Sequence, residues 1–237
     1  MLPKVSCLCP TYGRVRVLEE AIHSFLTQDY CGPKELIILN DLADQELVFD
    51  HPEVRIVNTK NRIVPLGTKF NETAKLATGD LLCVWEDDDI YLPHRISYTV
   101  DHLENGLFHT HRAYYEHSFQ KIIRSANLFH SNLAIRPDIF WSVGGYSASD
   151  WCGIDTLIFE ALKQKYGNFS QEIADKDLFY IYRWITAQDY HASAWSSHNV
   201  SAMAADHVCG RILRGEIPTG IVPLVPRWSY NYLEYLP

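Results

Sequence analysis

The 237-residue sequence has no long apolar run and has fewer basic than acidic side chains. No segment approaches the roughly 18 consecutive apolar residues that cross a bilayer, so we expect no membrane-spanning helix. Lys and Arg number 21 against 29 Asp and Glu, which gives a net charge of −8. A sequence-independent nucleic-acid binder needs a basic surface, so we expect no nucleic-acid partner.

Cysteine is also sparse. Six cysteines in a chain of this length are too few for a disulfide scaffold, and no CxxC pair indicates a zinc site. Cys7, Cys9 and Cys83 lie inside apolar runs, where a free thiol behaves as a small hydrophobic group. The first ten residues lack the apolar core and cleavage site of a secretory leader. We therefore expect a cytoplasmic protein with reduced cysteines.

The overall composition is typical of a globular protein. Hydrophobic residues make up 47% of the chain and charged residues 21%, which allows a large core and excludes intrinsic disorder. The length suits one large domain, and the sequence contains no repeat, linker or low-complexity segment. We therefore predict a single domain over residues 1–237.

Strand and helix patterns alternate in the first half of the chain. Apolar runs predict strands at 5–9, 35–40, 54–57 and 80–85, and apolar stripes predict helices at 15–28, 67–78 and after Pro93. This alternation is typical of a mostly parallel sheet with helices on both faces. The second half is less regular, with strands predicted at 107–115 and 132–135 and a helix at 155–166. The tail from Gly220 shows no reliable period.

Polar side chains follow the predicted strands where each one ends. In such sheets the ligand binds at the carboxyl ends of the strands. The segments found there are Pro10-Thr11-Tyr12, Asn40-Asp41 and Glu86-Asp87-Asp88-Asp89. Four adjacent carboxylates repel one another without a counter-ion, and carboxylate oxygens are preferred ligands of Mg²⁺ and Mn²⁺. A solvated acidic turn before the next helix is the alternative, but the position after a buried strand favours a divalent cation.

These motifs together resemble the inverting family 2 glycosyltransferases with the GT-A fold. Four segments carry the resemblance in order, over roughly two thirds of the chain: residues 5–14, 35–41, 79–93, and the Gly144-Gly145-Tyr146 turn with Asp155. The resemblance implies an α/β GT-A (nucleotide-diphospho-sugar transferase) fold with a mostly parallel central sheet covered by helices. It also implies a nucleotide-binding half at 1–100 and an acceptor half with the C-terminal tail at 101–237.

The resemblance assigns the donor-binding residues position by position. They are Pro10, Thr11, Tyr12, Arg14, Asp41, Lys69 and Asp87. It implies that Tyr12 stacks on the base, Asp41 accepts a uracil N–H, Lys69 lies near the diphosphate and Asp87 lies near the ribose. Structural alternatives are a surface aromatic for Tyr12, a turn or cap carboxylate for Asp41 and a solvated helix lysine for Lys69.

The resemblance also implies a Mn²⁺ or Mg²⁺ cofactor held by Asp88, with Asp89 as an outer acid and Asp155 as the general base. Asp150 is the rival for the base. His191 matches a position near the metal and diphosphate and is predicted as a metal contact, with His198 and His207 as its rivals. His109 and His111 have metal-ligand spacing, but we favour a place on the acceptor side or the surface for them. Trp151, Trp184 and Trp195 either stack on a sugar acceptor or belong to the core.

The sequence departs from the family pattern beside two of these residues. Leu42 and Ala43 follow Asp41 where the family usually has Gly and Ser, and Ile154 precedes Asp155 where the family often has Glu. The loop that presents Asp41 and the acceptor contact beside Asp155 are therefore expected to differ from the family pattern.

The implied activity is transfer of a hexose from a UDP-sugar to a hydroxyl of a glycan, lipid-linked or protein acceptor. The alternatives are a non-catalytic nucleotide-sugar-binding module and a sugar-nucleotidyltransferase. The latter needs a Gly-rich loop after the first strand, and residues 10–14 contain one Gly. A homodimer stays open. Peripheral membrane contact by the tail is not expected, because residues 221–237 hold one Arg and no Lys.

Overall fold

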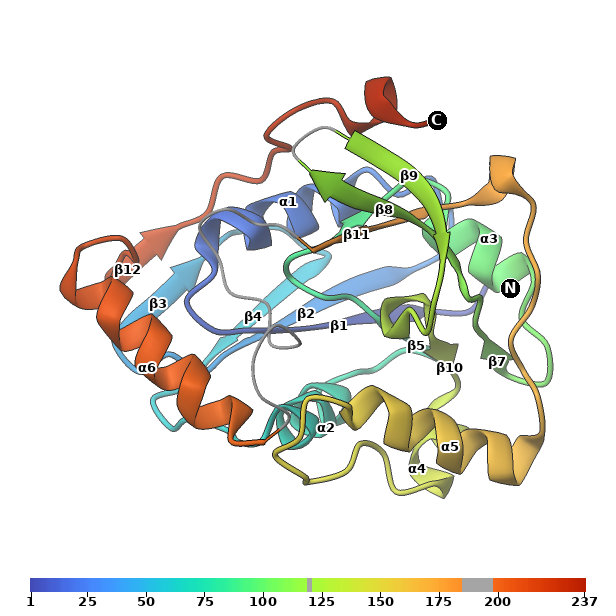
Figure 1. The fold of residues 1–237 in the computed structure, drawn as a ribbon, viewed down its shortest axis with the longest axis horizontal. Coiled ribbons are helices and arrows are strands. Elements are labelled where there is room, and N and C mark those ends of the chain that lie inside the picture. Colours follow the sequence, from blue (N-terminus) through green and yellow to red (C-terminus); the bar gives the residue numbers. More distant parts are fainter. Residues whose placement is uncertain (119–120, 185–197) are drawn as a thin grey trace.

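The computed structural model describes residues 1–118, 121–184 and 198–237. Its central sheet has six strands in the order β4-β2-β1-β5-β10-β7 (Figure 1). The bounds are β1 Val5–Thr11, β2 Lys34–Asn40, β4 Val54–Asn58, β5 Leu81–Val84, β7 Leu107–Phe108 and β10 Ala134–Ile135.

The centre of this sheet is parallel, as predicted. β1 pairs in parallel with β2 and β5, and β2 with β4. Only β10 and β7 run antiparallel to their neighbours in the sheet. Every residue of β1 is buried, because helices cover both faces, and this explains why its sequence is largely apolar.

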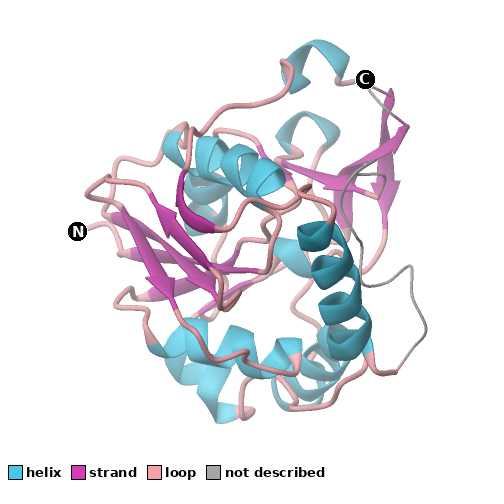
Figure 2. Cartoon of the chain, turned by 90° about the vertical axis from the view of Figure 1, so that its left-hand side faces the viewer, coloured by secondary structure: helices cyan, strands magenta, loops and turns pink. Residues whose placement is uncertain are grey.

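Helices cover the two faces of the sheet, as Figures 1 and 2 show from two directions. The bounds are α1 Val15–Leu26, α2 Leu66–Lys75, α3 Arg95–Asp101, α4 Pro137–Ser142, α5 Ile154–Tyr166 and α6 Val200–Leu213. α1 and α3 pack on one face, where Leu18, Ile22 and Phe25 of α1 are fully buried. α2, α4 and α5 pack on the other face in a second core cluster. The helix stripes read from the sequence are therefore the sides that meet the sheet.

A second sheet of four strands, in the order β6-β11-β8-β9, lies beside the first (Figure 2). Its strands are β6 Ile90–Tyr91, β8 Arg112–Ser118, β9 Lys121–Ala126 and β11 Tyr180–Arg183. The single strand predicted at 107–115 is wrong, because β7 and β8 belong to different sheets. The Asn132 side chain donates to the carbonyl oxygens of Thr110 and Arg112 at 2.9 and 3.0 Å and holds the connection between them.

The C-terminal tail contains a strand that the local pattern did not predict. β12 (Gly220–Pro223) pairs in parallel with β3 (Gln45–Val48), which lies far away in the sequence, so no local period reports it. The tail then crosses α1, where the Trp228 indole N–H donates to Ser24 Oγ at 2.9 Å. It ends in the 3₁₀ helix η4 (Tyr232–Tyr235), in which Tyr232 is buried. The tail therefore packs on the core, as expected.

One buried ion pair joins the tail, α1 and β11. The Arg183 guanidinium bonds to the Glu20 carboxylate and donates to the Tyr232 hydroxyl at 2.8 Å. Glu20 also accepts from the backbone N–H of Ser229 at 2.8 Å. The side chains of Arg183 and Glu20 are 3% and 1% exposed, so neither charge can be solvated by water.

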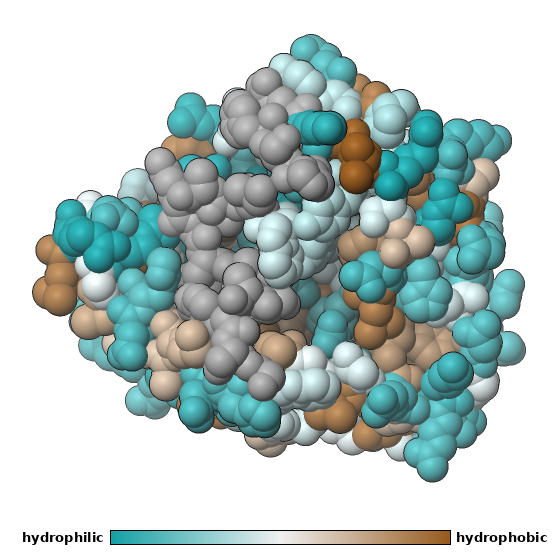
Figure 3. Space-filling model, viewed as in Figure 1, coloured by the Kyte–Doolittle hydropathy of each residue, from teal (hydrophilic) through white to brown (hydrophobic). Residues whose placement is uncertain are grey.

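The surface seen in Figure 3 is mostly hydrophilic over the described residues, and its apolar residues form separate patches. The six cysteines are free thiols, and Cys7, Cys9 and Cys83 are buried, which confirms their predicted place in the core. Within the described part of the chain, no helix has the length and apolar character needed to cross a membrane.

Replacing Glu20 by Ala is expected to destabilise the fold by about 3–5 kcal/mol, because Arg183 would be left as a buried, unpaired charge. Urea unfolding followed by circular dichroism measures the loss. Glu72→Ala is the control, since Glu72 pairs with Lys75 on the surface and such pairs contribute about 0.5 kcal/mol or less. Equal losses for the two variants would contradict a special role for the buried pair.

Candidate functional site

A cavity of about 420 Å³ lies at the carboxyl ends of β1 and β5. The predicted site residues that line it are Pro10, Thr11, Tyr12, Arg14, Lys69, Asp88 and Asp155. Asp41 and Asp87 are fully buried behind this lining. The fold thus brings Asp155, far away in the sequence, to the cavity that also contains the acidic loop. His191 and Trp195 lie outside the described residues.

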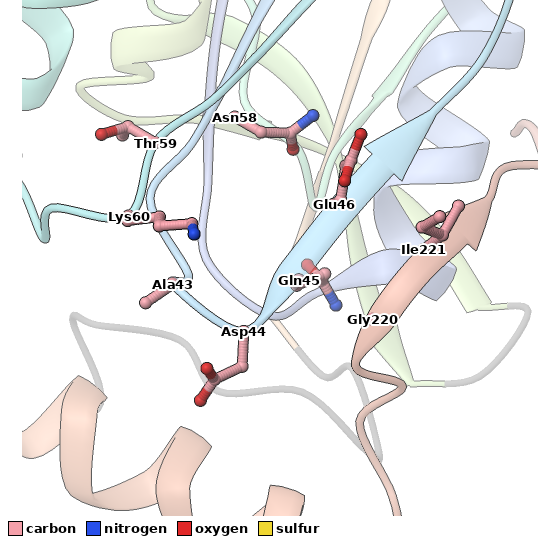
Figure 4. A pocket seen from close by; sticks show the side chains of 9 residues that line it. All are labelled: Ala43, Asp44, Gln45, Glu46, Asn58, Thr59, Lys60, Gly220 and Ile221. Carbon is pink, nitrogen blue, oxygen red and sulfur yellow. The ribbon is translucent and has the colours of Figure 1, made fainter.

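A second hollow, of about 510 Å³, lies where the β2–β3 turn meets the end of β4 and the start of β12 (Figure 4). Its side chains include Asp44, Gln45, Glu46 and Lys60. None of the described residues predicted to bind donor, metal or acceptor lines it. The smaller cavity is therefore the candidate functional site, because the predicted donor, metal and base residues line it.

The acidic loop after β5 supplies the negative side of this cavity. Carboxylate oxygens of Glu86, Asp88 and Asp89 lie within 4.8 Å of one another. Asp89 points into the protein, where it accepts from the Tyr180 hydroxyl and, at 2.8 Å, from the Arg183 backbone N–H. Glu86 and Asp88 line the cavity. Asp89 is thus a structural anchor for the loop, consistent with an outer position.

Crowding and burial disfavour the charged forms of these acids. Burial raises the pKa of Asp87 to about 6; the Arg14 guanidinium opposes this rise and the charge of Asp88 adds to it. The pKa of Asp89 is raised well above its ordinary value by burial and by the charges of Asp88 and Glu86. A divalent cation would relieve this repulsion, and the hard oxygen donors of Glu86 and Asp88 suit Mg²⁺ or Mn²⁺.

Arg14 provides a positive charge to the acidic loop from within the protein. Its guanidinium forms a fork on Asp87 and also donates to Asp88 Oδ2 at 2.7 Å. The Arg14 side chain is 13% exposed and lies in the cavity lining. Arg14 therefore contacts the same carboxylate that is predicted to bind the metal, so it can orient Asp88 and balance part of its charge.

The part of the cavity that the resemblance assigns to the nucleoside is built around Asp41. Asp41 is 1% exposed and accepts from Arg62 Nη1 at 2.5 Å, the Ile63 N–H at 2.7 Å and Lys69 Nζ at 2.6 Å. The Arg62 guanidinium also lies 3.6 Å from the centre of the Tyr12 ring. Arg62 thus contacts both Asp41 and Tyr12, the two residues that the resemblance assigns to the base. Arg62 was not predicted from the sequence.

Lys69 connects this part of the cavity to β1. Its ammonium group donates to the Thr11 carbonyl as well as to Asp41. Burial lowers the pKa of Lys69 to about 8, although the Asp41 charge opposes the shift. Lys69 is therefore a buried structural and electrostatic group and not the solvated helix lysine of the alternative interpretation.

The departure from the family pattern after Asp41 has a packing reason. Leu42 is 6% exposed and forms a small apolar cluster with Val208 and Ile217, against which Tyr12 also packs. α6, which carries Val208, lies beside β3 and β12 in Figure 1. Leu42 therefore anchors α6 next to the Asp41 loop. The sequence analysis did not predict α6.

Asp155 lies in the first turn of α5, partly exposed, and lines the cavity. Its rival Asp150 accepts from the Ser201 N–H at 3.1 Å and from the Ser201 hydroxyl at 2.6 Å. Asp150 thus stabilises the start of α6. This arrangement supports Asp155 as the carboxylate available to an acceptor.

The histidines fall into separate environments. His109 is buried and bonds to Ser170 Oγ at 2.8 Å and the Phe129 carbonyl at 3.2 Å. Burial lowers its pKa to about 3, so it is a neutral core residue. The one group of three metal-ligating residues found in the described chain is the acidic one. His130 lines the cavity and was missed by the sequence analysis, because its neighbours Leu128, Phe129, Ser131 and Asn132 form no recognisable motif.

Comparison with known proteins finds a family model and sequence relatives that match this chain. The model of glycosyl transferase family 2 matches residues 6–152. EpsE of Bacillus subtilis (strain 168), whose name assigns it to the glycosyltransferases, is 30% identical over 110 residues, which are 43% of this chain and 39% of EpsE.

Solved structures share the fold at low identity. The mannosyltransferase PcManGT from Pyrobaculum calidifontis, in complex with GDP-Man and Mn²⁺, matches with a TM-score of 0.60 and 17% identity, over 92% of this chain and 66% of that chain. S. aureus TarS 1–349 in complex with UDP-GlcNAc matches with a TM-score of 0.61 and 14% identity, over 86% and 66%. The fold is the GT-A fold predicted from the sequence. The chain spans under half of the length of EpsE and about two thirds of each solved chain.

The lowered pKa of Lys69 predicts a pH dependence of stability. Between the folded value of about 8 and the unfolded value of about 10.4, the unfolded chain holds a proton that the folded chain has lost. The free energy of unfolding should therefore gain up to about 1 kcal/mol per pH unit from Lys69 in this window.

Urea unfolding at several pH values between 7 and 11, compared between the natural chain and Lys69→Met, isolates this contribution. The natural chain should gain stability relative to the variant as the pH rises through the window. Parallel curves for the two proteins would show that Lys69 keeps an ordinary pKa.

Proposed function

Since this chain belongs to glycosyl transferase family 2, we propose that it transfers a hexose from a UDP-sugar to a hydroxyl group, in a metal-dependent reaction with inversion at the anomeric carbon. The observation that carries this proposal is one cavity that joins Asp88, Asp155, Tyr12 and Lys69. Such a reaction requires three parts, which are a site for the nucleoside, the acidic loop and the N-terminal turn of α5 that carries Asp155.

The donor binds with its base at Tyr12 and Asp41 and its diphosphate toward Lys69 and Arg14. In an acidic protein, these two basic side chains and the cation supply the positive charge that a diphosphate needs. TarS 1–349 was solved with UDP-GlcNAc and PcManGT with GDP-Man, so the fold accommodates nucleotide sugars of both bases. A uridine donor is favoured here because Asp41 lies at the position that the resemblance assigns to the uracil N–H.

Asp88, with Glu86 beside it, would hold Mn²⁺ or Mg²⁺ at the diphosphate. When bound, this ion acts as a Lewis acid that neutralises charge developing on the leaving nucleoside diphosphate. Asp87 and Asp89 do not line the cavity and support the loop from behind, through Arg14 and through Tyr180 and Arg183.

Asp155 accepts the proton of the acceptor hydroxyl while the hydroxyl oxygen bonds to the anomeric carbon and the bond from that carbon to the diphosphate breaks. This single displacement inverts the anomeric centre. General-base assistance of this kind contributes about 10²–10⁴ in rate. The acceptor, on a glycan, lipid or protein, enters beside Asp155 and Trp184, which also lines the cavity.

The first experiment measures thermal stability against a panel of nucleotide sugars, with Mn²⁺ or with a chelator. A ligand at about 100 times its Kd adds roughly 2.7 kcal/mol, which raises the melting temperature by about 5–11 °C for a domain of this size. A Mn²⁺-dependent shift with UDP-sugars supports the proposal and selects donors for a transfer assay. Binding without hydrolysis or transfer under any condition would favour the non-catalytic binding module.

Substitution of the two carboxylates separates binding from chemistry. Asp88→Asn is expected to abolish the Mn²⁺-dependent shift, because it removes the ligand charge. Asp155→Asn is expected to retain the shift and to lower transfer by about 10²-fold or more. Asp150→Asn is the matched control and should transfer normally once its folding is verified. Normal transfer by Asp155→Asn would refute the assignment of the base.

Arg62→Ala is expected to tighten UDP binding by about 2–5-fold. The contact between Arg62 and Tyr12 is worth about 0.5–1 kcal/mol at a partly exposed site, and the base must displace it in order to stack on Tyr12. Isothermal titration with UDP and Mn²⁺ measures the change, and Arg55→Ala, on the exposed part of β4, is the control. Weaker binding by Arg62→Ala would show that Arg62 itself contacts the donor.

A further inference from the structure

A series of hydrogen bonds runs from the acidic loop through the wall of the cavity to the turn at Tyr146. His130, in the 3₁₀ helix η1 (His130–Asn132), bonds through Nδ1 to Glu86 Oε1 at 3.0 Å and through Nε2 to the Tyr146 hydroxyl. His130 and Tyr146 are 7% and 3% exposed. Glu86 is 30% exposed at its side chain, so it is the member of this series that faces the cavity most openly.

The partners determine which nitrogen of His130 carries the proton. An ionised carboxylate only accepts hydrogen bonds, so Nδ1 must donate to Glu86. The neutral ring then accepts at Nε2 from the Tyr146 hydroxyl. The Glu86 carboxylate therefore selects the tautomer, and the Tyr146 hydroxyl, which can donate or accept, satisfies Nε2 and helps to fix the ring.

The fold fixes both ends of this series of hydrogen bonds. At one end the backbone N–H of Glu86 donates to the Tyr91 hydroxyl at 2.6 Å. At the other end the Asn71 side chain bonds to the N–H and the carbonyl oxygen of Tyr146, each at 2.9 Å. Gly145 has a φ of +69°, and a Cβ there would lie 2.5 Å from Asn71 Oδ1, so this clamp needs glycine at that position.

Ring packing holds His130 between these ends. The Phe70 ring lies 5.4 Å from the His130 ring and 4.9 Å from the Tyr146 ring, measured between centroids. Phe70 and Asn71 follow Lys69 on α2, so this helix supports both the nucleoside end of the cavity and the Tyr146 turn. The histidine is therefore confined on two sides before any ligand binds.

We propose that His130 is a positioning residue that holds the Glu86 carboxylate beside Asp88 for the divalent cation, with Tyr146 fixing the imidazole ring through Nε2. This proposal rests on the proposed function. Its physical basis is that a ligating carboxylate confined by a hydrogen bond loses less freedom when it binds an ion. Removal of such an outer partner typically costs 10–100-fold in metal affinity or activity.

The test is the affinity for Mn²⁺ in the presence of UDP, measured from the electron paramagnetic resonance signal of free Mn²⁺, which needs no turnover. His130→Ala is expected to weaken Mn²⁺ binding by about 10–100-fold. His130→Asn places an amide N–H near the position of Nδ1 and should retain affinity within about 3-fold. His130→Gln places its amide near Nε2, away from Glu86, and should behave like His130→Ala.

Tyr146→Phe retains the ring packed on Phe70 and removes only the hydroxyl. It should weaken Mn²⁺ binding by about 3–10-fold, less than His130→Ala, because the buried Nε2 then loses its partner and the ring is less firmly fixed while the bond to Glu86 remains. His109→Asn is the control, since His109 is a buried histidine with two hydrogen bonds that lies outside the cavity lining. It should leave the Mn²⁺ affinity unchanged in folded protein, as verified by circular dichroism.

Two results would overturn this inference and leave the proposed function standing, provided that the natural chain binds Mn²⁺ and UDP. In the first, His130→Ala binds Mn²⁺ as tightly as the natural chain. In the second, His130→Asn and His130→Gln lose the same amount of Mn²⁺ affinity. Failure of the natural chain to bind Mn²⁺ with UDP would overturn both proposals.

Discussion

The arrangement of the site depends on the contacts of one buried residue, Arg183. Arg183 bonds to Glu20 of α1 and Tyr232 of the tail, donates from Nε to the backbone oxygen of Asp88, and donates from its backbone N–H to Asp89. The acidic loop is thus held through its main chain by a residue of the second sheet. Without this support, four adjacent carboxylates at the end of a buried strand would repel one another toward solvent.

Compensation of buried charge recurs along the cavity. Arg14 balances Asp87 and Asp88, while Lys69 and Arg62 balance Asp41. Each of these carboxylates is almost fully buried, so a basic partner is required for the charged form to exist there. The protein therefore contains its own cations at the places where a diphosphate, a metal ion or a nucleobase would bind. Under the proposed function, donor binding would exchange these ion-pair partners for groups of the donor.

Helix α2 connects the surroundings of Asp41 to the turn at Tyr146. Lys69 bonds to Asp41 and to the Thr11 carbonyl, Phe70 packs on His130 and Tyr146, and Asn71 clamps the Tyr146 backbone. Gly67, in the first turn of this helix, lies so close to the loop between α4 and α5 that a Cβ would sit 2.1 Å from the Ser147 backbone oxygen. The two halves of the chain therefore meet at a tightly packed contact.

The sequence alone determined the parts whose signal is local. Uninterrupted apolar runs in β1, β2 and β5 predicted a covered parallel sheet, because strands buried on both faces need apolar side chains at every position. The acids after β5 followed from the rule that ligands bind at the carboxyl ends of strands, and the GT-A fold followed from the resemblance.

Only the tertiary structure decided which side chains meet. It paired β12 with β3, placed Arg62 on Tyr12 and Asp41, used Asp150 to stabilise α6, and set His130 between Glu86 and Tyr146. These contacts join segments that are distant in sequence, and their energy depends on burial and orientation. The local sequence around a residue reports neither its burial nor its orientation. The sequence therefore identified the acidic residues, and the tertiary structure determined which residues they contact.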